Sequence, residues 1–387
     1  MDDRLDSCYR SIQDSMTIYG FYSIIHFVLS AVGDGHFEYT LPRRAADYLV
    51  KHIRYFPMRL WFMGDTAYVI CGRDGFPSGT EILSIDGHRI GEITNRLFDF
   101  LTGDGTIWTN KRHLLNDDDD NFSALYYFVY GPRLVFTIEY RVPSGEIRKT
   151  DLPADYDRNI RCDFESEKIH GLALEFKDNR VAILTVGRFD TKQAKFNNFL
   201  QTSFAEISRK QCKTLIIDLR NDGGGEDGNG AALYSWLTDK PFSYYASLVA
   251  MDQKRNARYQ EHPQLRLQQP AASPFSGKVY FLINGYSFSA TAEFCAVARS
   301  EKRGEFIGEE TGGGYYGNTS GDDTLLVLPN TRITVDIPLT KYTMAVRKTE
   351  YPDRGIIPDH PILPSFADWM GRKDVQLQYA LQLAGTN

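Results

Sequence analysis

The stretch "KVYFLINGYSFSATAEFCAVARS", residues 278–300, joins an apolar run to a helix-like run through a short polar turn. The first part, "KVYFLIN" (278–284), is typical of a buried strand, and "ATAEFCAVARS" (290–300) of a helix. Ser287 and Ser289 lie in the turn between them. A serine at a helix N-terminus is most often a cap. On a sharp strand-to-helix turn it can also expose its Oγ as a nucleophile, with the next amide, here that of Ala290, holding an oxyanion.

The same alternation of strand and helix continues on both sides of this stretch. From about Gly171 onward, apolar runs that read as strands alternate with helical segments, namely "RVAILTV" (180–186), "KTLIIDL" (213–219) and "EFIGEE" (305–310). Uniformly apolar strands joined by helices indicate a sheet covered on both faces. We therefore predict an α/β core over residues 156–387.

A glycine-rich loop follows one of these strands, in "TLIIDLRNDGGGEDGNG" (214–230). Consecutive glycines at 223–225 permit positive φ angles and let backbone amides converge on an anion. The loop fits neither the GxGxxG nor the lysine-containing P-loop pattern of nucleotide sites. Taken alone, the glycines favour a tight strand-to-helix turn.

The first 155 residues differ in pattern. Residues 1–58 predict a helical lobe that runs into the loop "AVGDGHFEYTLP" (31–42), and residues 59–155 predict a small β-rich domain. Within that domain, "GFPSGTEILSIDGHRI" (75–90) resembles the carboxylate-binding region of PDZ-like modules. A long insertion from Phe98 to Ala124 departs from that pattern, and its acidic run Asp117–Asp120 is expected to be a solvated loop, because calcium-loop spacing is missing.

Composition excludes several classes of protein. The 387 residues, 42% hydrophobic and 24% charged, predict a soluble protein of two or three domains. A net charge of −6 argues against a nucleic-acid partner. The five cysteines lack metal or framework spacing, so neither a zinc site nor a disulfide framework is predicted. No apolar stretch reaches the ~18 residues of a membrane span. Without a signal-peptide pattern, the location is cytoplasmic, or extracytoplasmic (periplasmic) if an export signal has been removed.

Four motifs, in order, carry a family resemblance. They are "DLRNDGGG" (218–225), "NGYSFSATAEF" (284–294), "IGEETGGG" (307–314) and "GIIPDHPILPS" (355–365), the last followed by "GRKDVQLQYAL" (371–381). This order resembles the serine peptidases of the C-terminal-processing, or tail-specific, protease family, which includes the tricorn core and interphotoreceptor retinoid-binding protein. The likeness covers about the last 220 residues closely and the rest more loosely. It implies a ββα-type core of the crotonase/ClpP kind, a peptide or protein substrate, and no metal or organic cofactor; the oligomeric state stays open.

The resemblance assigns roles to particular residues. Its nucleophile corresponds to Ser289, which leaves Ser287 a local structural role. Its oxyanion donors correspond to the backbone amides of Ala290 and Gly224. Asp222 stands where many relatives have asparagine, a departure that bears on the hydrogen bonding of the glycine-rich loop.

The base and its partner are where the sequence departs from the best-known branch of the family. The Ser/Lys branch carries a lysine after its GExTxG motif, and Gly314 occupies that place here. The tricorn-like branch uses a histidine from the N-terminal lobe, which corresponds to His36 in "VGDGH". A lone histidine is usually structural, but its convergence with Ser289 and the missing lysine favours His36 as the base. The third member of the triad is expected to be Glu350, with Asp353 and Asp34 as alternatives.

The sequence thus predicts a serine endopeptidase or C-terminal-tail peptidase that acts through an acyl-enzyme. The alternative from another class is a non-catalytic protein that binds peptides or apolar ligands on the same fold. A crotonase-like acyl-CoA enzyme is a weaker rival, because the motifs do not resemble its signatures.

Overall fold

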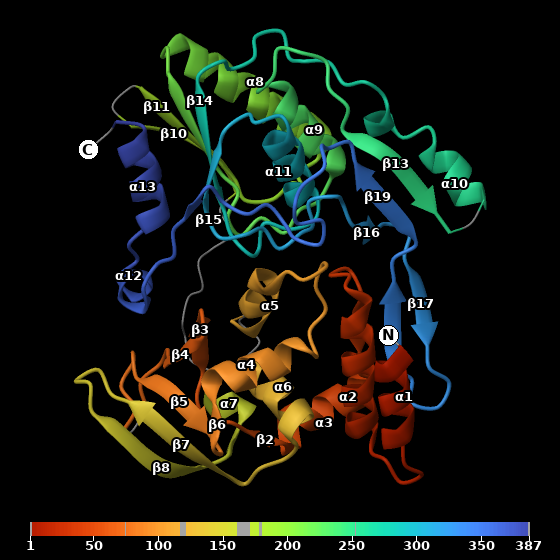
Figure 1. Cartoon of the computed structure of the whole chain (residues 1–387), viewed down its shortest axis with the longest axis vertical. Helices are drawn as coiled ribbons and strands as arrows, with labels where there is room; N and C mark the ends of the chain where they lie inside the picture. Colours follow the sequence, from red (N-terminus) through yellow and green to blue (C-terminus); the bar gives the residue numbers. More distant parts are fainter. Residues whose placement is uncertain are drawn as a thin grey trace.

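The computed structural model describes residues 2–73, 75–116, 121–160, 171–177, 180–251 and 253–385. Figure 1 shows most of the segments from β10 onward, in green and blue, above the N-terminal helices in red and a β-rich domain in orange and yellow, with β17 reaching down to the level of α1. The molecule has a mixed α/β fold with two large hydrophobic cores, one in each tier.

The upper tier is built on a six-stranded sheet in the order β10-β11-β12-β14-β15-β20. Its strands are β10 (Leu172–Lys177), β11 (Val181–Val186), β12 (Thr214–Asp218), β14 (Lys278–Ile283), β15 (Glu305–Gly308) and β20 (His360–Pro361). Strand β10 is antiparallel to β11, and the other pairs are parallel. The apolar runs of the sequence therefore form the predicted sheet.

Helices cover both faces of this sheet, which explains why the central strands β11, β12 and β14 are mainly apolar and buried. Alternate residues of β14 point to opposite sides: Phe281 packs with Phe294 of helix α11 (Ala290–Ser300), whereas Tyr280 lies in the cluster of helix α13 (Val375–Leu383). Helices α8 (Gln193–Arg209) and α9 (Asp227–Ser235) share the α11 face. Each face thus buries one half of every strand.

The lower tier holds an antiparallel sheet in the order β3-β4-β5-β7-β8, with β6 paired to β5. Its strands are β3 (Leu60–Met63), β4 (Thr66–Val69), β5 (Glu81–Ile85), β6 (His88–Arg89), β7 (Val135–Arg141) and β8 (Ile147–Pro153). Helices α4 (Ile90–Phe98), α5 (Trp108–Leu115) and α6 (Asn121–Tyr130) contribute to its core, which extends from Phe56 to Ala154. The predicted insertion thus contains helical segments; its acidic run, Asp117–Asp120, lies outside the described residues.

The remaining elements connect the tiers. The N-terminal lobe consists of α1 (Asp2–Ser11), α2 (Ile18–Leu29), η1 (Ser30–Val32), β1 (Glu38–Thr40) and α3 (Arg43–His52), followed by β2 (Arg54–Tyr55), β9 (Asp155–Tyr156) and α7 (Asp157–Ile160). Excursions from the core form β13 (Tyr245–Ala250), α10 (Gln253–Tyr259), η2 (Pro263–Leu265), β16 (Thr319–Ser320), β17 (Thr324–Val327), β18 (Thr334–Ile337), β19 (Thr340–Met344) and α12 (Phe366–Met370). Strand β1 of the N-terminal lobe pairs with β18, which comes from the C-terminal half of the chain.

The structure also bears on two expectations from the composition, one about membrane spans and one about disulfides. No helix among the described residues has the length and apolarity that a membrane crossing requires. Cys71 is disulfide-bonded, whereas Cys8, Cys212 and Cys295 are free and buried. Spacing along the chain did not reveal the bonded cysteine, because pairing depends on distance in space.

The aromatic packing under the sheet gives a test of the core. Phe281 is 0% exposed and stacks on Phe306 with ring centroids 4.7 Å apart. We expect Phe281→Ala to lower the free energy of unfolding by about 3–5 kcal/mol, because it removes buried apolar contacts and leaves a cavity. Chemical denaturation measures this, with Leu325→Ala, at a site 61% exposed, as the matched control. Equal effects of the two substitutions would contradict the packing described.

Candidate active site

Ser289 occupies a strained turn between β14 and α11. Its backbone angles are φ 51° and ψ −127°, a combination that residues with a side chain rarely adopt. It stands at the N-cap position of α11 but makes no side-chain capping hydrogen bond. The amide of Phe288 donates to the carbonyl of Asp222 at 3.1 Å and so ties the turn to the glycine-rich loop. Ser289 is therefore held in an unfavourable conformation without serving as a cap.

Ser287 has the local structural role that the sequence predicted. It is fully buried, and its Oγ donates to the carbonyl of Leu219 at 2.9 Å. The same Oγ accepts a hydrogen bond from the amide of Asn284 at 3.1 Å. These bonds join the ends of β12 and β14, which are adjacent parallel strands. The two loops that follow those strands consequently lie at one edge of the sheet.

His36 meets Ser289 across 253 positions of sequence. Its Nε2 lies 3.1 Å from the Oγ of Ser289, within hydrogen-bond range. The imidazole stacks on the ring of Phe288 with centroids 4.6 Å apart, which fixes its plane. The loop that carries His36 lies between η1 and β1, and the pairing of β1 with β18 holds it against the core. The structure thus brings together the serine and the histidine that the sequence selected.

Two aspartates stand on the other side of the imidazole. Asp34 accepts the His36 amide at 2.8 Å, and its Oδ1 lies 3.7 Å from His36 Nδ1. At that length the contact with the ring is electrostatic rather than a hydrogen bond. Asp104 is buried, and its two carboxylate oxygens accept the amides of Gly35 at 2.8 Å and Gly314 at 3.0 Å.

Asp104 was missed by the sequence analysis, although the sequence contained a signal for it. The loop "GDG" at 103–105 repeats the "GDG" at 33–35. The two loops lie against each other, with the amide of Gly105 donating to the carbonyl of Gly33 at 2.9 Å. Asp104 also accepts the amide of Gly314. Gly314 is the position that corresponds to the lysine of the Ser/Lys branch.

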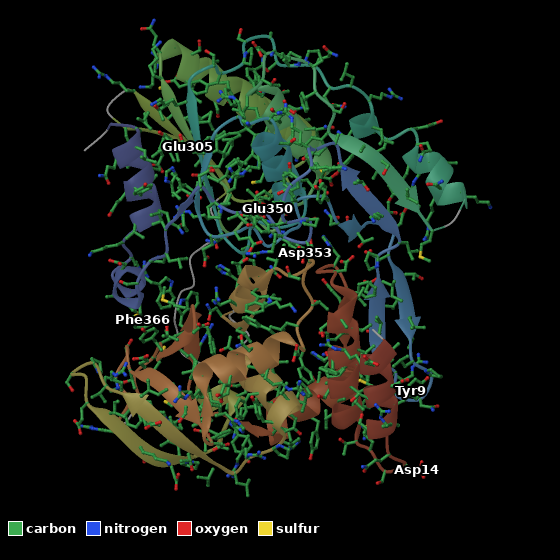
Figure 2. The ribbon with its side chains drawn as sticks, in the orientation of Figure 1. Tyr9, Asp14, Glu305, Glu350, Asp353 and Phe366 are labelled. Carbon is green, nitrogen blue, oxygen red and sulfur yellow. The ribbon has the colours of Figure 1, made fainter. Side chains whose placement is uncertain are left out.

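Glu350 and Asp353, the other candidates for the third member, lie in the segment that leads to β20, where Figure 2 labels both. Glu350 is exposed, and no recorded contact within the described part of the chain joins it to His36. Asp353 accepts hydrogen bonds from Thr106, through its carbonyl at 2.9 Å and its carboxylate at 3.0 Å. It therefore supports the loop of Asp104. Of the sequence candidates, only Asp34 adjoins the imidazole.

The environment of His36 favours its charged form. Burial disfavours charge and would lower the pKa of the imidazole. The interaction with Asp34 and the charges of Asp104 and Glu293 outweigh burial and hold the pKa above the ordinary 6.5. Asp34, His36 and Asp104 are also close enough together to be considered as metal ligands. However, Asp104 already uses both oxygens on backbone amides, an arrangement suited to fixing the loops.

The predicted oxyanion donors lie next to Ser289, but one of them is engaged. Gly224 has φ +99°, and a Cβ added there would lie 2.7 Å from the Cβ of Ser289. Its amide donates to Asp222 Oδ1 at 2.9 Å. Ala290 begins helix α11, where the first amides have no partner within the helix. The substitution of aspartate for asparagine at 222 thus acts directly on the Gly224 amide.

Asp222 is a buried carboxyl with an unusual titration. It is 0% exposed, and its Oδ2 has no hydrogen-bond partner among the described residues. Burial raises its pKa from 3.8 to about 7, against the opposing effect of the Gly224 amide. Because the folded-state pKa exceeds the unfolded-state value, ionisation on raising the pH from about 4 to 7 lowers the stability of the fold.

We expect Asp222→Asn to remove this dependence, since an amide keeps the Oδ1 acceptor and carries no charge. The melting temperature of the variant, relative to that of the unchanged protein, should be higher at pH 8.5 than at pH 5.5 by about 2 °C or more. Glu293, whose pKa is also raised to about 7, is present in both proteins and cancels in the comparison. A difference independent of pH would show that Asp222 does not titrate in this range.

Comparison with known proteins shows that part of the chain resembles a known family. Residues 180–362 match the model of peptidase family S41. A segment of 109 residues is 29% identical to the tail-specific protease of Haemophilus influenzae; it spans 28% of this chain and only 14% of that protein.

Solved structures share the fold over almost the whole chain. Mature CPAF complexed with lactacystin superposes with a TM-score of 0.63 at 14% identity, covering 98% of this chain and 91% of that one. A putative peptidase from Parabacteroides merdae gives a TM-score of 0.51 at 17% identity, covering 99% and 88%. Residues 180–362, the part of the chain that holds Ser289, are therefore similar to peptidase family S41.

Proposed function

We propose that the protein is a serine endopeptidase or C-terminal-tail peptidase that cleaves peptide bonds through an acyl-enzyme, with Ser289 as nucleophile and His36 as base. The observation that carries the proposal is the 3.1 Å contact between His36 Nε2 and the Oγ of Ser289 on a strained turn. A neutral imidazole at this distance can accept the serine proton as Oγ attacks a peptide carbonyl.

The remaining steps use groups beside this pair. The Ala290 amide is placed to donate to the oxyanion that forms on the carbonyl, and the Gly224 amide joins it by exchanging Asp222 Oδ1 for the new acceptor. His36 then gives its proton to the departing amine, which leaves an acyl group on Ser289. Water, deprotonated by the same imidazole, hydrolyses this ester and restores the serine.

For the third position we propose Asp104 together with Asp34, in place of Glu350. The two carboxylates flank the imidazole, whereas Glu350 is exposed. Their charge stabilises the imidazolium that forms during attack. This supports the Ser/His mechanism over the Ser/Lys one. Lys341 lines a cavity of about 210 Å³ that Asp34 and Asp104 also line, and Lys341 is exposed.

The β-rich domain is proposed to hold or present the substrate, as its PDZ-like sequence predicts. Its β5, which contains "EILSI", lies between β4 and β7, so the sheet edges are β3 and β8. An extended peptide would add to one of these edges. Trp61 on β3 stacks on Trp369 of α12 with ring centroids 4.0 Å apart, so that edge also contacts the C-terminal part of the chain.

We expect Ser289→Ala to reduce peptide turnover by about a thousandfold or more, because it removes the nucleophile. The melting temperature should be retained, since the side chain makes no capping bond. A fluorophosphonate probe, followed by mass spectrometry, should label Ser289 in the unchanged protein.

Ser287→Ala is the matched control for this test. It removes two buried hydrogen bonds, so it should lower the melting temperature while the probe still labels Ser289. Turnover retained in Ser289→Ala, or lost only in proportion to folded protein, would refute the assignment. Absence of labelling together with tight peptide binding would favour the non-catalytic binding protein.

A second expectation concerns pH. Activity should fall as the pH drops through the raised pKa of His36, because imidazolium cannot accept the serine proton. Asp104→Asn removes one of the charges that raise this pKa, so the acid limb of the kcat profile should move to lower pH and kcat should fall about tenfold or more. The pH profile distinguishes this effect from a general loss of structure.

Glu350→Gln provides the comparison, since the exposed carboxylate should leave the limb in place. His36→Ala should abolish activity, whereas Lys341→Ala should retain it. If Glu350→Gln shifts the acid limb of the kcat profile and Asp104→Asn does not, Glu350 is the third member of the triad. Activity lost in the lysine variant and kept in the histidine variant would restore a Ser/Lys mechanism.

A further inference from the structure

A second cavity, of about 730 Å³, opens directly beside Ser289 and Ala290. Its walls come from the start of α9, from β13 and β19, from the end of α10 through the start of η2, and from the chain around Gly321. The catalytic steps above use only its edge. The cavity is therefore a candidate for the place where a substrate side chain binds next to the scissile bond.

Acidic residues outnumber basic residues in the lining of this cavity. Four of its residues are acidic: Glu226, Asp227, Glu261 and Glu293. The basic lining residues are Arg258 and His262. The Arg258 guanidinium is already paired with Asp322, and His262 Nε2 lies 3.4 Å from Asp227 Oδ2. The cavity thus holds more negative than positive charge.

The floor of the cavity is a network in which two carboxyls share one hydroxyl proton. Tyr245 Oη lies 2.6 Å from Glu293 Oε2 and 3.1 Å from Asp227 Oδ2. A phenol has one proton to donate, so it satisfies one carboxylate at a time. Glu293 is 3% exposed, and its other oxygen accepts from Asn318 Nδ2 at 2.8 Å. Burial, followed by the charge of Asp227, raises the pKa of Glu293 to about 7.

The distance of this floor from the nucleophile selects a long side chain. Glu293 follows Ser289 by four residues on the same helix, which corresponds to about 6 Å along the axis. A lysine ammonium on its four-carbon stem, or the longer arginine side chain, covers that distance. The rings of Tyr245, Tyr259 and Tyr342 line the route, and aromatic faces attract such cations.

We infer that this cavity binds a lysine or arginine side chain of the substrate, at the residue that supplies the acyl group, through the carboxylates of Asp227 and Glu293. The inference rests on the proposed peptidase function. The Tyr245 hydroxyl can donate its proton to only one of the two carboxylates, and the bound cation neutralises the negative charge that remains. Cleavage is therefore directed to the carboxyl side of basic residues.

The test uses the full chain and matched peptides. Cleavage sites are first mapped by mass spectrometry in an unfolded protein substrate. Quenched peptides that differ only at the acyl-side residue then compare lysine with norleucine, and arginine with citrulline, two neutral analogues of similar length. We expect kcat/KM at pH 8 to favour the charged member of each pair by tenfold or more. Asp227→Asn should reduce that ratio toward one, and Glu206→Gln, a change on α8 outside the lining of the cavity, should leave the ratio unchanged.

The outcomes separate this inference from the proposed function. Cleavage with no preference, or with preference for the neutral member, overturns the inference while the peptidase assignment stands. A preference that Asp227→Asn leaves intact also overturns it. If folded protein cuts no peptide and the fluorophosphonate probe fails to label Ser289, the proposed function itself fails.

Discussion

The active centre depends on the contact between two Gly-Asp-Gly loops. The buried carboxylate of Asp104 accepts one amide from the loop of His36 and one from the core loop at Gly314. It thereby fastens the N-terminal lobe to the core at the point where the imidazole must face the serine. The pairing of β1 with β18 supports the same arrangement from further along the chain. Without these contacts, the histidine would have no fixed position relative to Ser289.

The site is also rich in carboxyl groups. Asp34 and Asp104 face the imidazole, and Glu293, Asp227 and Asp222 lie within the core on the side of the serine. The carboxylates near His36 favour the protonated form of its imidazole. Those without a cationic partner are held partly neutral by burial, as the raised pKa values of Asp222 and Glu293 show. The surroundings of each carboxyl group therefore decide whether it stabilises the charged imidazole or has a raised pKa itself.

Much of this molecule could be predicted from the order of its residues. The apolar strands of the core, the glycine-rich loop and the turn at Ser289 are local patterns, and each formed where the sequence placed it. The resemblance selected His36, which no local pattern could have linked to a serine 253 residues away. The position of Asp104 beside His36 could not be predicted, because it depends on a contact between two loops that are far apart in the sequence. Glu350 was chosen by spacing from a motif, and spacing does not determine where an irregular segment turns. The occupied Gly224 amide likewise depends on a side-chain orientation that composition does not reveal.

The division of the centre among three distant segments also bears on how the chain is made. His36 lies near the start of the sequence, Asp104 in the β-rich domain and Ser289 in the last third. During synthesis the N-terminal parts emerge and fold first, before the turn that carries Ser289 has been made. Contacts between residues so far apart form late and slowly, because a long loop must close first. A growing chain therefore lacks the contact between His36 and Ser289 until its last third has been made and has folded.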